Sequence, residues 1–235
     1  MTLWTIATAA DEARRRATVA VLPIGSFEQH GPHLPLATDT IVASAIATAL
    51  AERYDLFLLP PITLSCSHEH AAWRGTVSLS STTLTAIIND VVASLHGQGI
   101  DRLVLVNGHG GNYVLSNVVQ EANTDRPRLA LFPGRQDWDQ ARHDAGLQST
   151  THDDMHAGEI ETSILLHAAP DAVGSDFGTA DHLTERPHLL TLGMTAYTST
   201  GVIGQPSLAA EAKGQAVLAS LARSFEDTLT MLTRQ

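Results

Sequence analysis

The 235-residue sequence contains one cysteine, Cys66, and one lysine, Lys213. A single cysteine excludes an intramolecular disulfide and a zinc site built from several thiolates. A Schiff-base mechanism would depend on one lysine in a predicted late helix, so we disfavour it. No apolar run reaches the roughly 18 residues of a membrane span, and residues 1–20 lack the basic-then-apolar order of a signal peptide. These absences predict a cytoplasmic protein with no membrane partner.

Basic residues are also few compared with acidic ones. The chain has 14 lysines and arginines against 25 aspartates and glutamates, a formal net charge of −11. Because nucleic-acid binding depends on neutralising phosphates, this balance predicts no nucleic-acid partner. The apolar fraction of 43% is typical of a globular protein. With no repeat or linker in the sequence, we expect one domain over residues 1–235.

Short apolar runs alternate with helix-like stretches along the chain. Because strand–helix–strand alternation builds parallel sheets, this order predicts an α/β fold with helices on both faces of a mostly parallel sheet. In such folds functional side chains collect where strands end. The patterns predict strands at 19–24, 56–59, 76–79, 102–106 and 129–132, and helices at 39–54, 81–95, 112–122, 159–167 and 209–232.

Histidine is abundant where cysteine is scarce, with twelve residues of this type. Any transition-metal site would therefore use imidazole and carboxylate, ligands that suit Zn, Mn or Fe(II). After the first predicted strand, Glu28 and His30 share one face of an extended segment, and Asp39 follows at a predicted helix start. The alternative is a polar loop ending in an N-cap aspartate. Three ligand types within twelve residues favour a site.

A glycine-rich loop follows the predicted strand at 102–106. His109 lies at the strand tip, and the amides of Gly110, Gly111 and Asn112 are candidate oxyanion donors. The loop lacks the spacing of a dinucleotide fingerprint and the lysine of a P-loop. The alternative is an ordinary strand–helix turn with an incidental histidine.

Two further segments concentrate histidines and carboxylates. In the first, His156 and Glu159 have helical i,i+3 spacing, and either Glu159 or Glu161 is a candidate to bind a metal or accept a proton from water. We assign Asp153 and Asp154 beside them to an acidic helix start favoured by the helix dipole.

The second of these segments surrounds the cysteine. Here His68 and His70 alternate along a predicted extended stretch, so that one of them faces the site. Glu69 and His70 are candidate substrate contacts, and Cys66 is expected to be a small buried residue.

Taken in order, three strings resemble the creatininase family of metal-dependent amidohydrolases. They are GSFEQHGPHLPLATD (25–39), NGHGGN (107–112) and HAGEIETS (156–163), and the stretch 201–206 resembles the closing loop of that family. The likeness runs from about residue 24 to about residue 214. It implies a three-layer α/β/α fold, two divalent metal ions, and a homo-oligomer, often a hexamer. The implied activity is hydrolysis of a non-standard or cyclic amide C–N bond by a metal-activated water.

The resemblance also implies roles for individual residues. Glu28, His30, Asp39 and His109 match the metal ligands of the family, with Asp39 bridging the two ions. His156 matches a catalytic or substrate-contacting histidine that would donate a proton to the leaving nitrogen or steady the oxyanion.

The chain departs from the creatininases at Gly111, where they have a glutamate. Family members that carry NGHGGN recruit the glutamate of the HAGxxETS string instead, here Glu161, with Glu159 as the alternative. Arg74 replaces a proline, and Trp138 is the candidate for the tryptophan lid of creatininases.

These departures leave the substrate open between branches of the family. One branch trims the mycofactocin precursor peptide and another deformylates a formylaminopyrimidine. The expected substrate is therefore a small-molecule amide or a short peptide. A non-enzymatic protein with structural metals is disfavoured, because structural sites are usually closed and rich in thiolate.

Overall fold

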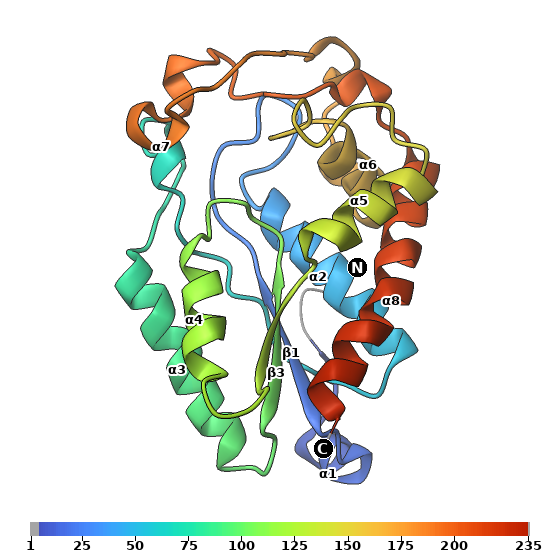
Figure 1. The fold of residues 1–235 in the computed structure, drawn as a ribbon. Coiled ribbons are helices and arrows are strands. Elements are labelled where there is room, and N and C mark those ends of the chain that lie inside the picture. The colour runs from blue at the N-terminus through green and yellow to red at the C-terminus, as the bar shows by residue number, and fades with distance from the viewer. Residues whose placement is uncertain (1–4, 235) are drawn as a thin grey trace.

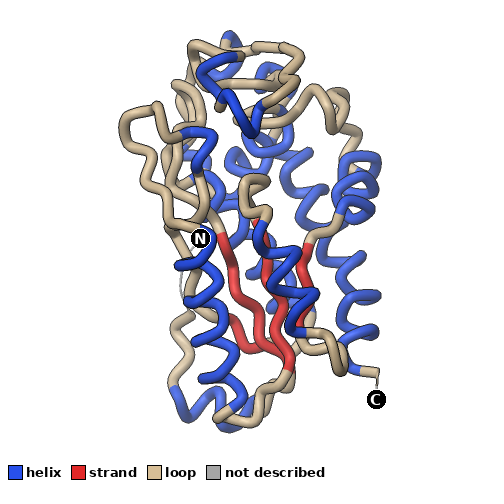
Figure 2. Tube along the Cα trace, turned by 60° about the vertical axis from the view of Figure 1, so that its left-hand side comes forward, coloured by secondary structure: helices blue, strands red, loops and turns tan. Residues whose placement is uncertain are grey.

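The computed structural model describes residues 5–234. Its four strands form one parallel sheet in the order β2-β1-β3-β4, visible side by side in Figure 2. The central pair is in register from Val19 opposite Arg102 to Ile24 opposite Asn107, so both strands end at the same edge. The strands are β1 (Val19–Ile24), β2 (Phe57–Leu58), β3 (Arg102–Asn107) and β4 (Leu129–Phe132).

Helices cover both faces of this sheet, which gives three layers (Figure 1). One face carries α3 (Ser81–His96) and α4 (Val114–Ala122), and the other carries α2 (Thr38–Arg53), α5 (Arg135–Asp144), α6 (Glu159–Ala168) and α8 (Glu211–Thr233). The three-layer α/β/α fold with a parallel sheet is thus confirmed. Two short helices, α1 (Ala9–Arg15) and α7 (Leu189–Leu192), lie outside these layers.

Alternation along the strands builds two hydrophobic cores. Val104 and Val106 of β3 pack with α2, α6 and α8, whereas Leu103 and Leu105 pack with α3 and α4. Successive strand side chains point to opposite faces, so a strand covered on both sides is apolar throughout. That is why the continuous apolar runs identified β1 and β3 correctly.

One expected strand is absent, and two helices were not predicted. Residues 76–79 form no strand, because Val77 and Leu79 donate single backbone hydrogen bonds to the loop residues Phe27 and Ser65 and join no ladder. Helix α5 was not expected, since its sequence RQDWDQARHD is polar and buries only Ala141 and Arg142. Helix α1 was missed for the same reason, as it buries no residue. Among the described residues, no helix is both long and apolar enough to cross a membrane.

Candidate metal centre

The edge where β1 and β3 end meets the first turn of α2. Gly108 follows β3, and its N–H donates to the carbonyl of Ile24 at 2.9 Å. A Cβ atom on Gly108 would clash with the backbone oxygen of Asp39, so only glycine allows this approach. The close packing brings Asp39 beside the two strand tips.

The carboxylate of Asp39 lies between two imidazoles. Its Oδ1 is 3.0 Å from Nε2 of His30, and its Oδ2 is 3.0 Å from Nδ1 of His109. The Ser26 hydroxyl also donates to Oδ2, at 2.6 Å. Asp39 is 1% exposed, and the positive imidazoles overcome its burial and hold its pKa well below the usual range. One carboxylate with an imidazole on each oxygen has the arrangement of a bridging ligand.

A hydrogen bond to a backbone carbonyl orients each of the two imidazole rings. The Nδ1–H of His30 donates to the carbonyl of Glu28 at 3.0 Å, which leaves Nε2 directed at Asp39. The Nε2–H of His109 donates to the carbonyl of Cys66 at 2.8 Å, which leaves Nδ1 directed at Asp39. Metal-binding histidines typically use their second nitrogen in this way.

Glu28 provides the clearest sign that a cation belongs here. Its side chain is fully buried, and within residues 5–234 neither carboxylate oxygen has a hydrogen-bond partner. The Nε2 atoms of His70 and His109 each lie 3.2 Å from one of its oxygens. Burial raises the pKa of Glu28 to about 7, and the charge of Asp39 adds to this rise. A buried carboxylate without donors is costly unless a cation neutralises it.

Three groups of buried or half-buried side chains have the spacing of metal ligands. They are Glu28, Asp39 and His109; His30, Asp39 and Glu161; and Glu28, His30 and His156, with ligand atoms within 4.8 Å of one another in each group. The first two groups share Asp39. The donor set therefore fits two neighbouring divalent ions bridged by one carboxylate.

The two glutamates of the third motif lie in different surroundings. The carboxylate of Glu161 approaches His30 and Asp39, accepts the Ala157 N–H at 2.7 Å, and has its pKa raised to about 8 by burial. The carboxylate of Glu159 instead accepts the Ser149 N–H at 2.8 Å and pairs with Lys213. The proposed pairing of His156 and Glu159 on one helical face is wrong, because His156 precedes α6 and bridges to Ile203.

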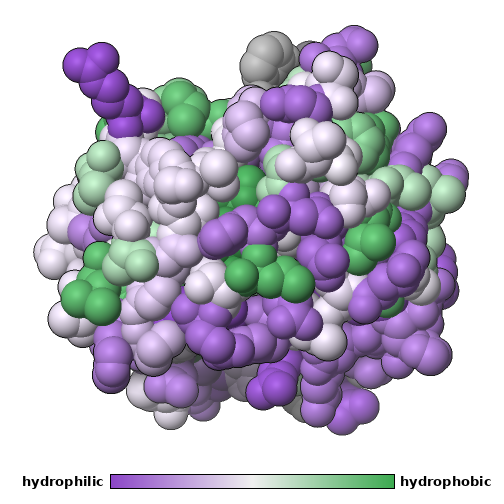
Figure 3. Space-filling view, turned by 90° about the horizontal axis from the view of Figure 1, so that it is seen from above, coloured by the Kyte–Doolittle hydropathy of each residue, from purple (hydrophilic) through white to green (hydrophobic). Residues whose placement is uncertain are grey.

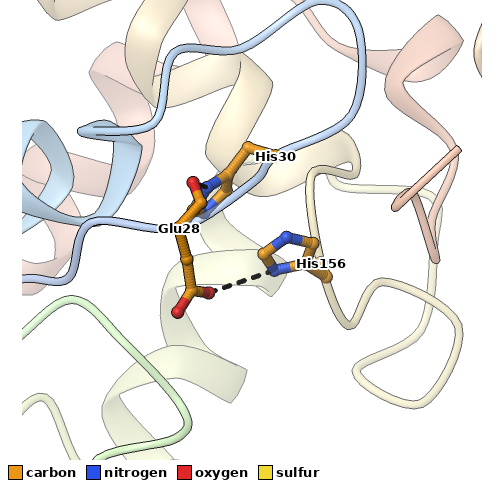
Figure 4. Close-up of side chains that lie close together, drawn as sticks. All are labelled: Glu28, His30 and His156. Carbon is orange, nitrogen blue, oxygen red and sulfur yellow. Dashed lines mark hydrogen bonds and ion pairs between the residues drawn. The ribbon is translucent and has the colours of Figure 1, made fainter. Parts of the chain in front are cut away.

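His156 lies beside Glu28 and His30 (Figure 4), and its other ring neighbour is His70. The ring of His156 lies 4.2 Å from that of His30 and 4.4 Å from that of His70. Burial, reinforced by the charge of His30, lowers the pKa of His70 to about 3 and that of His156 well below its usual value. The Nε2–H of His156 donates to the carbonyl of Gln29 at 2.6 Å, and its Nδ1 lies 3.8 Å from Oε1 of Glu28.

Gln29 is a site residue that we did not select from the sequence. Its side-chain amide donates to Nδ1 of His70 at 2.9 Å and to the carbonyl of Gly201 at 3.1 Å. It stands between two predicted ligands, Glu28 and His30, and that position was the available signal.

Of the remaining candidate residues, some lie in the site and others only hold its loops in place. His70 is buried and His68 exposed, but they lie on a 3-10 turn (His68–His70) and not on an extended stretch. The side chain of Asn112 accepts the Cys66 N–H at 3.2 Å and donates to Asn107 at 3.0 Å, so it ties the loop together.

A cavity opens from the ligand groups toward α5. It has a volume of about 380 Å³ and reaches His109, Gly110, His156 and Glu161. Its lining also includes the apolar side chains of Trp138, Met155 and Ile160. A small ligand bound in this cavity would contact the candidate metal ligands directly.

Comparison with known proteins agrees with this geometry. The family model described as "Creatininase: Creatinine amidohydrolase" matches residues 4–229. The chain is 34% identical over 223 residues to the mycofactocin precursor peptide peptidase of Mycolicibacterium smegmatis, with 90% of this chain and 84% of that protein covered. It is 27% identical over 233 residues to the creatinine amidohydrolase of Pseudomonas putida, with 90% and 88% covered.

The same fold occurs in solved structures. A crystal structure of creatinine amidohydrolase superimposes with a TM-score of 0.81 at 26% identity, over 98% of this chain and 97% of that one. Structures of creatininases in a Zn-Zn and an Mn form share the fold. The parallel sheet, the carboxylate–imidazole cluster at its edge and the match over almost the whole chain lead to one assignment: this protein belongs to the creatininase family.

Proposed function

We propose that the protein is a metal-dependent amidohydrolase that cleaves an amide C–N bond in a short peptide. The observation that carries the proposal is the shared Asp39 carboxylate between two ligand groups, next to the fully buried carboxylate of Glu28, which has no hydrogen-bond partner among residues 5–234. Such a centre suits hydrolysis by an activated water.

In this proposal Glu28, Asp39 and His109 hold one divalent ion, and His30, Asp39 and Glu161 hold the other. When bound, the ions would polarise the amide carbonyl and lower the pKa of a water molecule. Carboxylate and imidazole ligands accept Zn, Mn and Fe(II) alike.

His156 is the proposed proton carrier. Its Nε2–H is occupied by the carbonyl of Gln29, so Nδ1 carries the lone pair and faces Glu28. Nδ1 would take a proton from the attacking water and pass it to the nitrogen that leaves, so the same atom serves both halves of the reaction.

The cavity beside α5 is the proposed substrate site. Its volume of about 380 Å³ lies near the lower end of the range for small-ligand pockets, so it suits one or two amino-acid residues better than a long segment. The end of the molecule that carries the site loops is largely hydrophilic, with separate apolar patches (Figure 3). Gly110 lines the cavity beside His109, where its amide would face the developing oxyanion.

The relatives support a peptide substrate over a cyclic amide. Mycofactocin precursor peptide peptidases are 34–36% identical to this chain, against 27% for the creatinine amidohydrolase. A small cyclic amide is the second candidate, and the limited cavity volume is the observation in its favour. The homo-oligomer and the cytoplasmic location stay predictions.

A substrate panel tests the proposal. The metal-stripped protein would be reloaded with Zn, Mn or Fe(II) and incubated with short peptides, with creatinine and with cyclic ureides, and new amines would be detected by mass spectrometry. We expect cleavage of peptides only. Turnover of the cyclic amides alone would favour the second candidate. Dissociation of an oligomer on chelation, with no hydrolysis under any condition, would favour a structural role for the metals.

A further inference from the structure

Two ion pairs, one buried and one half-buried, fasten the start of α6. Arg142 of α5 donates from Nη1 to Oδ2 of Asp154 at 2.9 Å, and these side chains are 10% and 1% exposed. Lys213 of α8, the only lysine in the sequence, pairs with the fully buried Glu159. The two pairs thus tie the first turn of α6 to two neighbouring helices.

Backbone groups join the two ion pairs into one network. Asp154 accepts the N–H of Glu159 at 2.6 Å and that of Ile160 at 3.1 Å, so it caps the helix. Arg142 also donates to the carbonyl of Ser149 at 2.6 Å, while the Ser149 N–H donates to Glu159 at 2.8 Å. Asp154 is therefore more than the acidic helix-start residue that we expected, since it links three elements.

The segment held by this network carries the functional groups of α6. His156 and Ala157 lie between Asp154 and Glu159, and Glu161 follows two residues later. Ala157 has a φ of +53°, a left-handed conformation that a residue with a Cβ atom adopts at a cost. In that conformation its N–H donates to Oε2 of Glu161 at 2.7 Å. The surroundings must hold this backbone in place for the contact to persist.

Stability alone is a weak reason to place four charges at buried or half-buried positions. Replacing buried ion pairs by apolar side chains is often neutral or stabilising, because the desolvation of the charges offsets their attraction. A positioning role explains their presence better. The carboxylate that completes the group of His30 and Asp39 comes from Glu161 in the first turn of α6, so the placement of this turn sets the geometry of that group.

We propose that Arg142, Asp154, Glu159 and Lys213 form a clamp that positions Glu161 for the second metal ion. The inference rests on the proposed two-ion centre. None of the four residues is a ligand in it, so their effect on the ion passes through the backbone from Asp154 to Glu161.

Manganese binding to the stripped protein tests the clamp without any substrate. Lys213→Met leaves Glu159 its hydrogen bonds from Gln148 and Ser149, and Asp154→Asn keeps one acceptor oxygen, so both variants are expected to fold. Free Mn²⁺ would be followed by electron paramagnetic resonance during titration. We expect one ion to bind as in the wild type and the other about 10–100-fold more weakly, as for other residues that orient a ligand.

Three comparisons make the result specific. Lys213→Arg should restore the affinity of the second ion, because it keeps a cation beside Glu159. Arg223→Gln removes an exposed ion pair between the same helices, α8 and α5, and should leave both affinities unchanged. Excess Mn²⁺ should restore kcat in the weakened variants.

Two outcomes would overturn the inference, and a third would contradict only the proposed substrate. Variants that melt earlier but bind both ions with wild-type affinity would show that the clamp only stabilises the fold. If the wild-type protein binds a single ion, both the proposed two-ion centre and the proposed clamp are refuted. Normal two-ion binding without peptide cleavage would contradict the proposed substrate and leave the clamp standing.

Discussion

The carboxylate oxygen Oε1 of Glu69 occupies the space that a Cβ atom on Gly111 would need. The Nε2 atom of His109 borders the same space. Any side chain at position 111 would therefore push against a carboxylate and against a candidate metal ligand. The absence of a side chain here allows Glu69 to approach His109, and the charge of Glu69 contributes to the raised pKa of His109.

The first prediction compares two adjacent glycines. Gly111→Ala should displace His109 and weaken the binding of one metal ion. It should also lower the free energy of unfolding by about 1–3 kcal/mol, as for overpacked sites. Gly110→Ala is the matched control, because within the described chain no atom lies within 4 Å of the added Cβ. Thermal unfolding and metal titration would check both variants. Equal effects of the two substitutions would refute the steric argument.

The second prediction concerns the number of ions that each carboxylate holds. Glu28→Gln and Glu161→Gln should each lose one ion, whereas Asp39→Asn should lose both, because only Asp39 belongs to both ligand groups. Activity should fall by more than the 10–100-fold typical of residues behind the ligands. Elemental analysis of the purified variants gives the count. An Asp39→Asn protein that retains one ion, or a Glu28→Gln protein with full metal content, would contradict the assignment.

The third prediction separates catalysis from metal binding at His156. His156→Asn should keep both ions and lower kcat by about 10²–10⁴-fold, the usual contribution of a positioned acid–base group. KM should change little. His96→Asn is the control, since His96 is exposed and paired with Asp101. If His156→Asn loses an ion, the group of Glu28, His30 and His156 is the true ligand set.

The fourth prediction concerns pH. Burial raises the pKa of Glu28 to about 7 and that of Glu161 to about 8. Burial disfavours charge on His30 and His109, but the carboxylate of Asp39 outweighs it and raises their pKa values to about 9 and 10. Without metal ions, all four groups hold protons in the folded protein that the unfolded chain releases at lower pH.

Stability of the metal-free protein should therefore fall as pH rises from about 7 to about 10. His70 and His156 do not oppose this trend, since their lowered pKa values affect stability only below about pH 6.5. Metal ions replace the protons, so their stabilising effect should grow with pH. Melting temperatures at pH 7, 8 and 9, with chelator and with Mn²⁺, would test this. A melting temperature in chelator that rises over this range would disprove it. The control is Asp39→Asn, for which the melting temperature in chelator should depend less on pH.

Much of the fold and the site could be predicted from local patterns. The strands β1 and β3 were recognisable because a strand buried on both faces is apolar throughout. Glu28, His30, Asp39 and His109 were recognisable because each follows a strand or starts a helix, where parallel sheets collect functional groups. Helix α5 was not recognisable, because its sequence RQDWDQARHD contains too few apolar residues to mark a buried face.

The choice between Glu159 and Glu161 shows where the sequence alone stops. Two residues apart on a helix, their side chains point about 200° away from each other. The sequence determined that a carboxylate would lie on α6, but only the rotation of that helix decided which one approaches His30 and Asp39. The clamp of Arg142, Asp154, Glu159 and Lys213 sets that rotation through contacts with α5 and α8. Local spacing thus determined the types of ligand, and packing between distant segments decided their geometry, because the energy that orients a helix comes from its neighbours.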